Sequence, residues 1–333
     1  MQLSGDSRLY LTIVTDAYSP TTDRYNTDAF YHPNASNRQN VLATKGGHFL
    51  KQDPYAFDAA FFNVTAAEAM SFDPKQRIAM EVVYEALENA GKTLGKVAGT
   101  QTACYIGSSM SDYRDAVVRD FGHSPKYHIL GTCEEMISNR VSHFLDIHGP
   151  SATIHTACSS SLVATHLGCQ SLQSGESEMA IVGGVGMIIS PDGNMQLNNL
   201  GFLNPEGHSR AFDKNAGGYG RGEGCGILVL KRLDRALQDG DTVRAVIRAS
   251  SVNSDGWTQG VTMPSSEAQS ALIKYVYTSH GLDYGSTQYV EAHVSRTFEI
   301  DISSQGANQL NCQGHGNQSR RSSKGGSYSS HNR

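Results

Sequence analysis

The sequence lacks long apolar runs, clustered cysteines and a strong excess of one charge. No stretch approaches the roughly 18 apolar residues of a membrane span, and the first residues do not follow the order of a secretory signal. The six cysteines lie far apart without a Cys-x-x-Cys pair, which indicates reduced thiols rather than a disulfide framework. With 38% hydrophobic residues and a net charge of −5, the composition is typical of a cytoplasmic globular protein that does not enter a membrane.

Motifs for metal and nucleotide binding are also missing. None of the 13 histidines has a metalloprotease-like spacing, and Cys312 and His315 lack two further ligands. The glycine-rich run Gly217–Gly224 precedes a strand-like segment, whereas a dinucleotide fingerprint follows a strand and opens a helix. We therefore predict no metal and no directly bound cofactor. We interpret the run as a loop that approaches another part of the chain closely, with Arg221 and Glu223 able to pair across it.

The two ends of the chain differ from its middle. Residues 294–333 carry five basic and two acidic side chains, are rich in serine, glycine and asparagine, and hold almost nothing to bury after Ile302. This composition predicts a disordered tail. The tail is basic, but its charges are scattered, so nucleic-acid binding is a minor alternative and we predict no nucleic-acid partner. The divergent start of the chain offers one strand-like stretch, Leu9 to Thr15.

Helical and strand-like patterns alternate between these ends. Asp73 can cap a helix over about residues 74–90 that Gly91 ends. We expect strands at residues 103–106, 151–156, 179–182, 226–231, 243–251 and 288–292, and helices at about 136–145, 159–173, 233–238 and 266–278. Such alternation indicates an α/β fold with a largely parallel sheet. The strand, helix and strand between residues 151 and 182 form a β-α-β unit with a right-handed crossover.

Cys158 lies where the strand at residues 151–156 gives way to the next helix. A thiol at a helix N-terminus faces free N–H groups and the positive end of the helix dipole, and both favour the thiolate. The serines from Ser159 to Ser161 can cap the helix and hold the turn. A buried structural cysteine is the plain alternative. The position at the end of a parallel strand, where active sites of such sheets gather, favours a nucleophile.

His293 is the second candidate, because it ends the strand-like residues 289–292. By itself such a histidine is more often structural. A strand-end histidine that can face a cysteine, however, provides the arrangement of a Cys/His nucleophilic site. We therefore take Cys158 and His293 together as the candidate catalytic residues.

The residues around Cys158 resemble the nucleophile motif of β-ketoacyl synthases, in particular the ketosynthase domains of type I polyketide synthases. The resemblance is collinear over about residues 24–293. It rests on the motifs Phe72-Asp73-Pro74-Lys75-Gln76-Arg77, Ser138-Asn139-Arg140, Gly149-Pro150, Thr156-Ala157-Cys158-Ser159-Ser160-Ser161, Gly201-Phe202-Leu203, Phe212-Asp213, the Gly218-to-Gly224 loop, Asn253-Ser254-Asp255-Gly256 and Tyr289-Val290-Glu291-Ala292-His293. Residues 28–33 and 46–50 are similar to the fungal reducing type.

This resemblance implies a thiolase-like fold, in which two related α/β halves form αβαβα layers, usually as a homodimer. It implies the decarboxylative condensation of acyl and malonyl thioesters in polyketide or fatty acid biosynthesis. Cys158 would take the acyl chain from the phosphopantetheine arm of an acyl carrier protein. His293 would be the first of two histidines that assist decarboxylation of the malonyl unit. The phosphopantetheine would belong to the carrier partner and not to this chain.

The sequence departs from the family pattern at both ends and beside the nucleophile. After His293 the family's glycine-threonine run, later lysine and second histidine have no counterpart, and the opening strand is also missing. We therefore expect a truncated chain, with the first half of the fold largely present and the second half mostly missing. Its parts are a divergent segment at 1–25, the nucleophile-bearing half at 26–240, the start of the second half at 241–293 and the tail at 294–333.

His155 stands where the family has an aspartate. Two interpretations are open from the sequence. A cation at this position would lower the pKa of Cys158 further, or the side chain points away from the thiol.

Three functions are open from the sequence. The first is a ketosynthase that acylates Cys158 but lacks the second histidine for condensation, a loss of about 100-fold or more. The second is a non-catalytic interaction or dimerisation module, which would expose the apolar face that the missing half covers. The third, a thiolase proper, is disfavoured by the three serines after Cys158 and by the segment at residues 253–256.

Overall fold

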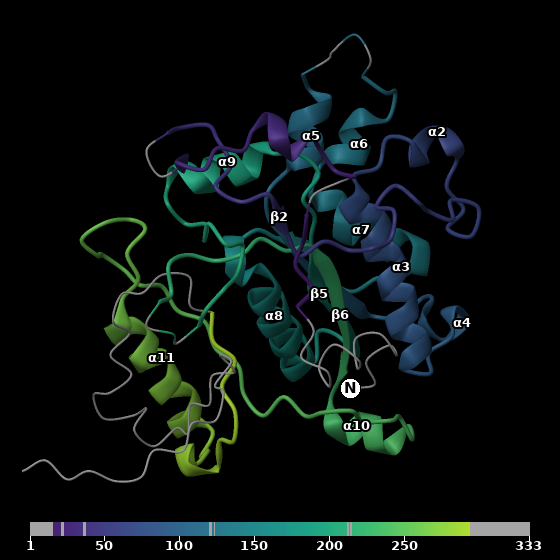
Figure 1. Ribbon diagram of the computed structural model, residues 1–333. Coiled ribbons are helices and arrows are strands. Elements are labelled where there is room, and N and C mark those ends of the chain that lie inside the picture. Colours follow the sequence, from purple (N-terminus) through teal and green to yellow (C-terminus); the bar gives the residue numbers. More distant parts are fainter. Residues whose placement is uncertain are drawn as a thin grey trace, which may run out of the picture.

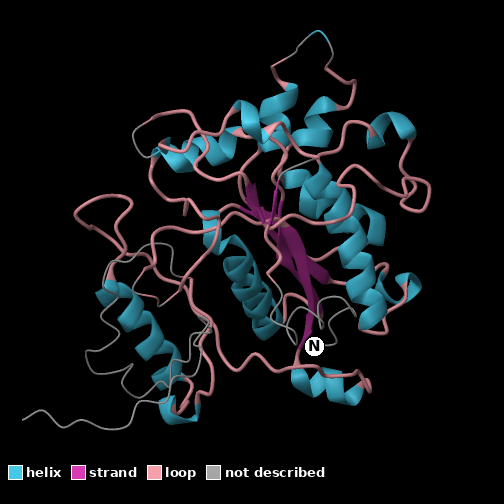
Figure 2. Cartoon of the chain, in the orientation of Figure 1, coloured by secondary structure: helices cyan, strands magenta, loops and turns pink. Residues whose placement is uncertain are grey.

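The computed structural model describes residues 16–293, apart from residues 21–22, 36–37, 120–121, 123, 212 and 214. The strand predicted at Leu9 to Thr15 and the disordered tail predicted at residues 294–333 lie outside the described residues. Helices cover both faces of a central sheet, as Figures 1 and 2 show. The predicted α/β class is therefore confirmed.

Four strands form the main sheet in the order β4-β3-β5-β6. They are β3 (Thr102–Ser108), β4 (Ser151–Ile154), β5 (Met179–Gly186) and β6 (Gly224–Lys231). β3 pairs parallel with β4 and β5, whereas β6 runs antiparallel to β5. Gly107 is the partner of both Ile154 and Gly184, so the three parallel strands end at one edge of the sheet. Since Gly186 pairs with Gly224, β6 begins at that same edge.

The helices match the predicted ones closely in the middle of the chain. The longer ones are α3 (Pro74–Asn89), α7 (Glu135–Leu145), α8 (Ser160–Ser174), α9 (Asp192–Asn199) and α11 (Ser266–Ser279). The shorter ones are α2 (Ala66–Ala69), α4 (Leu94–Val97), α5 (Asp112–Val117), α6 (His128–Thr132) and α10 (Leu233–Gln238). Asp73 caps α3 as predicted, because its carboxylate accepts the Lys75 N–H at 2.8 Å. A two-stranded ribbon pairs β1 (Ser19–Pro20) with β2 (Gly46–Gly47).

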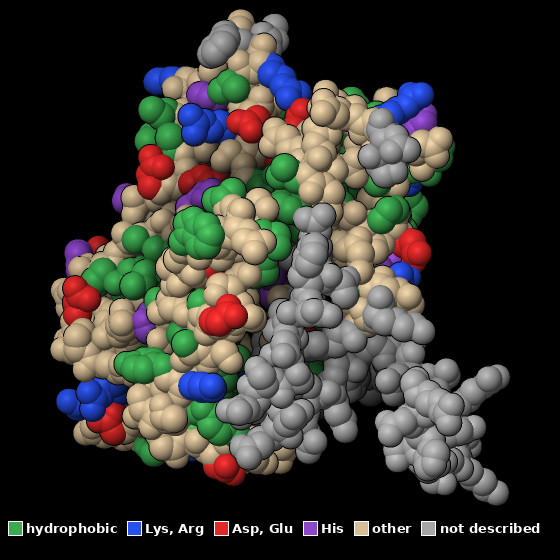
Figure 3. Space-filling model, turned by 90° about the vertical axis from the view of Figure 1, so that its left-hand side faces the viewer, with side chains coloured by type: hydrophobic (Ala, Val, Ile, Leu, Met, Phe, Trp, Pro, Cys, Tyr) green, Lys and Arg blue, Asp and Glu red, His purple; other side chains and the backbone are tan. Residues whose placement is uncertain are grey.

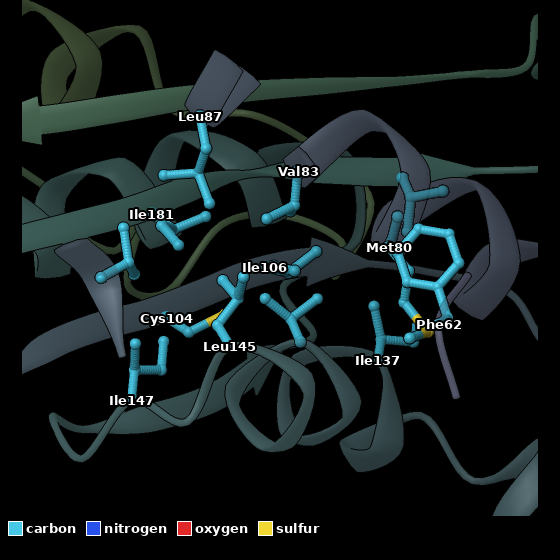
Figure 4. Packing of buried hydrophobic residues seen from close by; sticks show 14 of the residues in the cluster. Phe62, Met80, Val83, Leu87, Cys104, Ile106, Ile137, Leu145, Ile147 and Ile181 are labelled. Carbon is cyan, nitrogen blue, oxygen red and sulfur yellow. The ribbon is translucent and has the colours of Figure 1, made fainter. Parts of the chain in front are cut away.

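The core lies on both faces of the sheet, because the side chains of β3 alternate between them. Cys104 and Ile106 join the cluster under α3 and α7, whereas Ala103 and Tyr105 join the one under α8. Figure 4 shows the first cluster, with Phe62, Met80, Val83, Leu87, Ile137, Leu145, Ile147 and Ile181 around the two strand residues. Helices α5, α6 and α9 gather beyond the carboxyl ends of the parallel strands (Figure 1). Short helices and loops therefore surround the edge of the sheet at which the three parallel strands end.

The prediction of strands at residues 243–251 and 288–292 is wrong. Both segments run without regular secondary structure in the described part of the chain. A strand needs a neighbouring backbone to pair with its N–H and C=O groups, and neither segment pairs with one. The first runs beside α8, where His166 Nδ1 lies 2.9 Å from Ser250 Oγ.

Large apolar side chains are exposed in the part of the chain beyond β6. Trp257 is 89% exposed, and α11 presents Ile273 and Tyr275 to the surface. Figure 3 shows hydrophobic side chains scattered over the face of the molecule that α11 occupies. Within the described residues, no helix is long and apolar enough to cross a membrane.

Candidate active site

Cys158 lies on a sharp turn between β4 and α8. The turn is a single 3-10 segment, Ala157–Ser159, and α8 begins at the next residue. Ala157 has a φ of +53°, a left-handed conformation that a residue with a Cβ rarely adopts. The thiol that follows is exposed. The plain alternative from the sequence, a buried structural cysteine, is therefore wrong.

Two serine hydroxyls hold this turn. Ser160 Oγ accepts the Thr156 N–H at 2.8 Å and donates toward the carbonyls of Ala157 and Ser108, at 2.7 and 3.2 Å. Ser159 Oγ donates to the Thr156 carbonyl at 2.8 Å. Neither hydroxyl caps α8, so the predicted role in holding the turn is confirmed and the predicted capping is wrong. Because the serines bond back into the turn, no side-chain cap takes the first N–H groups of α8.

Two glycines let α8 begin directly against the strand ends. A Cβ on Gly107 would lie 2.5 Å from the Ser160 carbonyl carbon, and one on Gly184 would lie 2.7 Å from Ser161 Cβ. Real Cβ atoms do not approach other atoms this closely, so a side chain at either position would push the nucleophile turn away. The ends of β3 and β5 therefore fix the position of Cys158 relative to the sheet.

The structure brings His293 to Cys158. The two side chains form a hydrogen-bonded pair, and this bond lowers the pKa of Cys158 while partial burial opposes the shift. The same bond raises the pKa of the His293 imidazole. A thiol with a lowered pKa beside an imidazole whose pKa is raised is prepared for proton transfer to the ring and for attack by the sulfur. The two residues predicted from the sequence thus lie together, although the histidine comes from an unpaired segment and not from a strand.

The glycine-rich loop borders the same site. The charge of Arg221 further lowers the pKa of Cys158, and a charge on Cys158 contributes, after burial, to a raised pKa of Tyr219. The predicted close approach is confirmed, because a Cβ on Gly220 would lie 1.9 Å from the Gly207 carbonyl oxygen. The sequence offered one signal for Arg221, its place in this loop.

The predicted pairing of Arg221 with Glu223 is wrong. Glu223 Oε1 instead accepts Arg24 Nη2 at 2.6 Å, and both side chains are almost fully buried. The N-terminal segment brings Arg24 to this position, which spacing within the loop could not reveal.

His155 points away from the thiol. Its Nε2 lies 3.7 Å from Glu134 Oε2, on a pocket of about 370 Å³. The pocket is lined by Ser111, Arg114, Cys133, Glu134, Glu135, Thr153 and His155. Of the two interpretations left open by the sequence, the structure thus favours the second.

Lys75 is a residue behind the nucleophile that the sequence did not single out. Its Nζ donates to Met110 O at 2.6 Å, to Glu134 Oε1 at 2.7 Å and to Ser108 Oγ at 3.1 Å. The Ser108 carbonyl in turn accepts Ser160 Oγ, so Lys75 supports the strand end on which the turn rests. Only the motif at residues 72–77 pointed to this position. In the described part of the chain, no three side chains form a group able to hold a metal ion.

Two family models match the chain. The model for the beta-ketoacyl synthase N-terminal domain matches residues 11–236, and the model for the beta-ketoacyl synthase C-terminal domain matches residues 244–320. The second match continues past His293, where the motif resemblance ends.

Several curated proteins and solved structures are similar to this chain. It is 89% identical over 292 residues to a reducing polyketide synthase, hmp8, of Hypomyces subiculosus, and 80% identical over 282 residues to a highly reducing polyketide synthase, ZEA2, of Gibberella zeae. These alignments cover 88% and 85% of this chain but 12% of each relative, so the chain spans about an eighth of their length.

Among solved structures, the ketosynthase from module 6 of the bacillaene synthase of Bacillus subtilis 168 superposes with a TM-score of 0.79 at 34% identity, over 90% of this chain and 50% of that one. An oxazolomycin ketosynthase domain from Streptomyces albus gives a TM-score of 0.80 at 32% identity, over 89% of this chain and 51% of that one. The described fold therefore corresponds to about half of a ketosynthase.

Proposed function

This chain belongs to the β-ketoacyl synthase family, with the sequence of a ketosynthase domain of the fungal highly reducing polyketide synthases, and on that premise we propose that Cys158 accepts an acyl group from a thioester. The observation that carries the proposal is the hydrogen-bonded pair of Cys158 and His293 on the turn before α8. A thiolate is the reactive form for acyl transfer, and this pair favours it.

The proposed acyl transfer needs no proton donor or acceptor other than Cys158, His293 and the thioester. The Cys158 proton moves to His293, and the sulfur attacks the carbonyl carbon of the incoming thioester. The tetrahedral oxyanion forms near the first turn of α8, whose uncapped N–H groups are suitable donors for it. The donor's carbon–sulfur bond then breaks, its thiolate takes the proton from His293, and the acyl group stays on Cys158.

The proposal extends to the condensation that would follow acylation. Decarboxylation of a malonyl thioester yields an enolate that needs two preorganised donors, and His293 can provide one. Within the described residues, His293 is the histidine among the groups with the largest effects on the pKa of Cys158. We infer that this chain acylates itself weakly and does not condense, whereas a longer synthase that contains it performs both steps. The donor in that setting is the phosphopantetheine thioester of an acyl carrier protein, and the ketosynthase works as a homodimer.

A second candidate function is favoured by the exposed apolar side chains beyond β6. Nine large apolar side chains between Val243 and Tyr289 are exposed, Val261 fully and Trp257 nearly so, and such an accumulation is typical of an interaction surface. A chain of this kind could act without chemistry, as a module that associates with intact ketosynthase domains.

Mass spectrometry separates the two functions. The purified 333-residue chain is incubated with a hexanoyl N-acetylcysteamine thioester, and its peptides are mapped. We expect a hexanoyl adduct on Cys158 that is absent from C158A and unchanged in C169A, since Cys169 lies on α8 away from the turn. Folded chain that is alkylated at Cys158 by iodoacetamide but never acylated would contradict acyl transfer and favour the module.

A further inference from the structure

We propose that Arg221 is a second cationic group of the Cys158 site, in addition to His293, and that it holds the sulfur in its thiolate form. The inference deepens the proposed function, because it concerns the same nucleophile. It rests on the position of the guanidinium on the glycine-rich loop. It also rests on the finding that no carboxylate of the described residues forms an ion pair with that guanidinium.

The backbone of Arg221 is fixed from two sides. The loop enters β6 at the edge where the parallel strands end, because Gly224 pairs with Gly186. His48 bonds to the loop twice, donating its N–H to the Arg221 carbonyl at 2.9 Å and accepting the Glu223 N–H at 3.0 Å. The backbone of Arg221 is therefore held at the edge of the sheet from which the nucleophile turn also starts.

Glu223 anchors the loop a second time. Its carboxylate is fully buried and accepts Arg24 Nη2 at 2.6 Å, Leu50 N at 2.9 Å and Ile188 N at 3.1 Å. These donors come from the N-terminal segment and from the residues after β5. Because Glu223 is fully occupied in this way, it is not free to neutralise Arg221.

Within the described residues, no carboxylate contacts the guanidinium of Arg221. Its Nη1 donates to the thioether of Met110 at 3.2 Å, a weak acceptor, and its Nε is buried without a hydrogen-bond partner. Among the described residues it makes no ion pair of 4 Å or less. The nearby Lys75 differs, because Glu134 lies 2.7 Å and Asp73 3.9 Å from its Nζ. Two carboxylates therefore compensate the charge of Lys75 at short range, whereas the charge of Arg221 acts over a longer range, on both Asp112 and Cys158.

The other charged groups around this site are few. Asp112, on α5, faces Arg221: burial raises the pKa of its carboxyl, the charge of Arg221 lowers it, and the carboxylate accepts the Ile189 N–H at 3.3 Å. Tyr219 shares the loop, and burial raises its pKa, so it is neutral at physiological pH. His293 has the largest effect on the pKa of Cys158, and Arg221 adds to it. The imidazole of His155 lies toward Glu134.

The pH dependence of alkylation tests the inference. The rate of iodoacetamide labelling at Cys158 is followed by peptide mass spectrometry from pH 5 to pH 10 in the full chain. We expect R221M to label about two- to threefold more slowly than the parent at pH 7 and equally fast at pH 10, since a thiol loses tenfold in thiolate for each unit of raised pKa. R221K keeps the charge and should stay close to the parent, as should R235M, a control at an exposed arginine of α10.

Two results would overturn the inference. One is an R221M profile that superimposes on that of the parent. The other is an R221K profile that moves as far as that of R221M, which would assign the effect to loop packing. R221Q provides a second neutral variant should R221M lose its far-UV circular dichroism signal. Because alkylation needs no acyl donor, a chain that fails to acylate but shows the expected profiles would reject the proposed function and leave the role of Arg221 standing.

Discussion

The thiol of Cys158 and the imidazole of His293 form a hydrogen-bonded pair, although one follows β4 and the other ends the described chain. The bond lowers the pKa of the thiol and raises that of the imidazole, so each group favours the charged form of the other. The first consequence concerns the reactivity of the sulfur.

Removing the imidazole should make Cys158 a more ordinary thiol. In H293Q we expect alkylation of Cys158 by iodoacetamide at pH 7 to slow by about tenfold, because the folded-state pKa rises when its largest lowering cause is lost. The two proteins should react equally fast above pH 10, where both thiols are ionised. H280Q is a matched control, since His280 is an exposed histidine at the end of α11. Equal rates for parent and H293Q at pH 7 would show that the pair does not form in solution.

Neutralising Glu223 should destabilise the chain strongly. E223Q removes the buried counter-ion of the Arg24 guanidinium and leaves it only the exposed carboxylate of Asp23, which costs about 3–5 kcal/mol in the free energy of unfolding. Urea unfolding followed by circular dichroism measures this cost. D28N removes one partner of the exposed pair with Lys45 and should change the free energy of unfolding far less, because water screens that pair. A loss in E223Q no larger than in D28N would be incompatible with the buried pair.

A methyl group on Gly107 should displace the nucleophile turn. G107A places a Cβ 2.5 Å from the backbone of Ser160, so α8 must move away from β3. We expect a loss of about 1–3 kcal/mol in unfolding free energy and slower acylation of Cys158. G95A is the control, because a Cβ at Gly95 meets open space. If G107A acylates at the parent rate, the strand end does not set the position of the thiol.

Asp73 should make stability fall as the pH rises. Burial raises its pKa to about 6, against 3.8 for an ordinary aspartate, so between these values the folded state binds more protons than the unfolded one. Its contribution is therefore most favourable below pH 4 and is lost as the pH passes through 6. D73N keeps an oxygen to cap Lys75 and should be more stable than the parent at pH 7, by about 1–3 kcal/mol. Chemical unfolding at pH 4 and pH 7 tests this, and a D73N variant that is less stable at pH 7 would contradict it.

The local features of the fold were predictable from the sequence because their causes are local. Asp73 and Pro74 define the start of α3, and Gly91 has the positive φ of a helix end. The β-α-β unit around Cys158 also followed from strand and helix patterns that lie next to each other in the chain. The segments at 243–251 and 288–292 have the same strand-like composition, but a strand forms only where another backbone pairs with it, and composition does not show whether that partner is present.

The place of Cys158 at a strand-to-helix turn could be predicted from the sequence, because it depends on residues within a few positions of the thiol. Which groups surround the sulfur depends on the folded chain. It brought His293 and Arg221 to the thiol, sent His155 toward Glu134 and paired Glu223 with Arg24. These choices depend on side chains that the folded backbone places together from distant parts of the chain, and the electrostatic interactions that set a pKa act over ångströms in space rather than along the sequence.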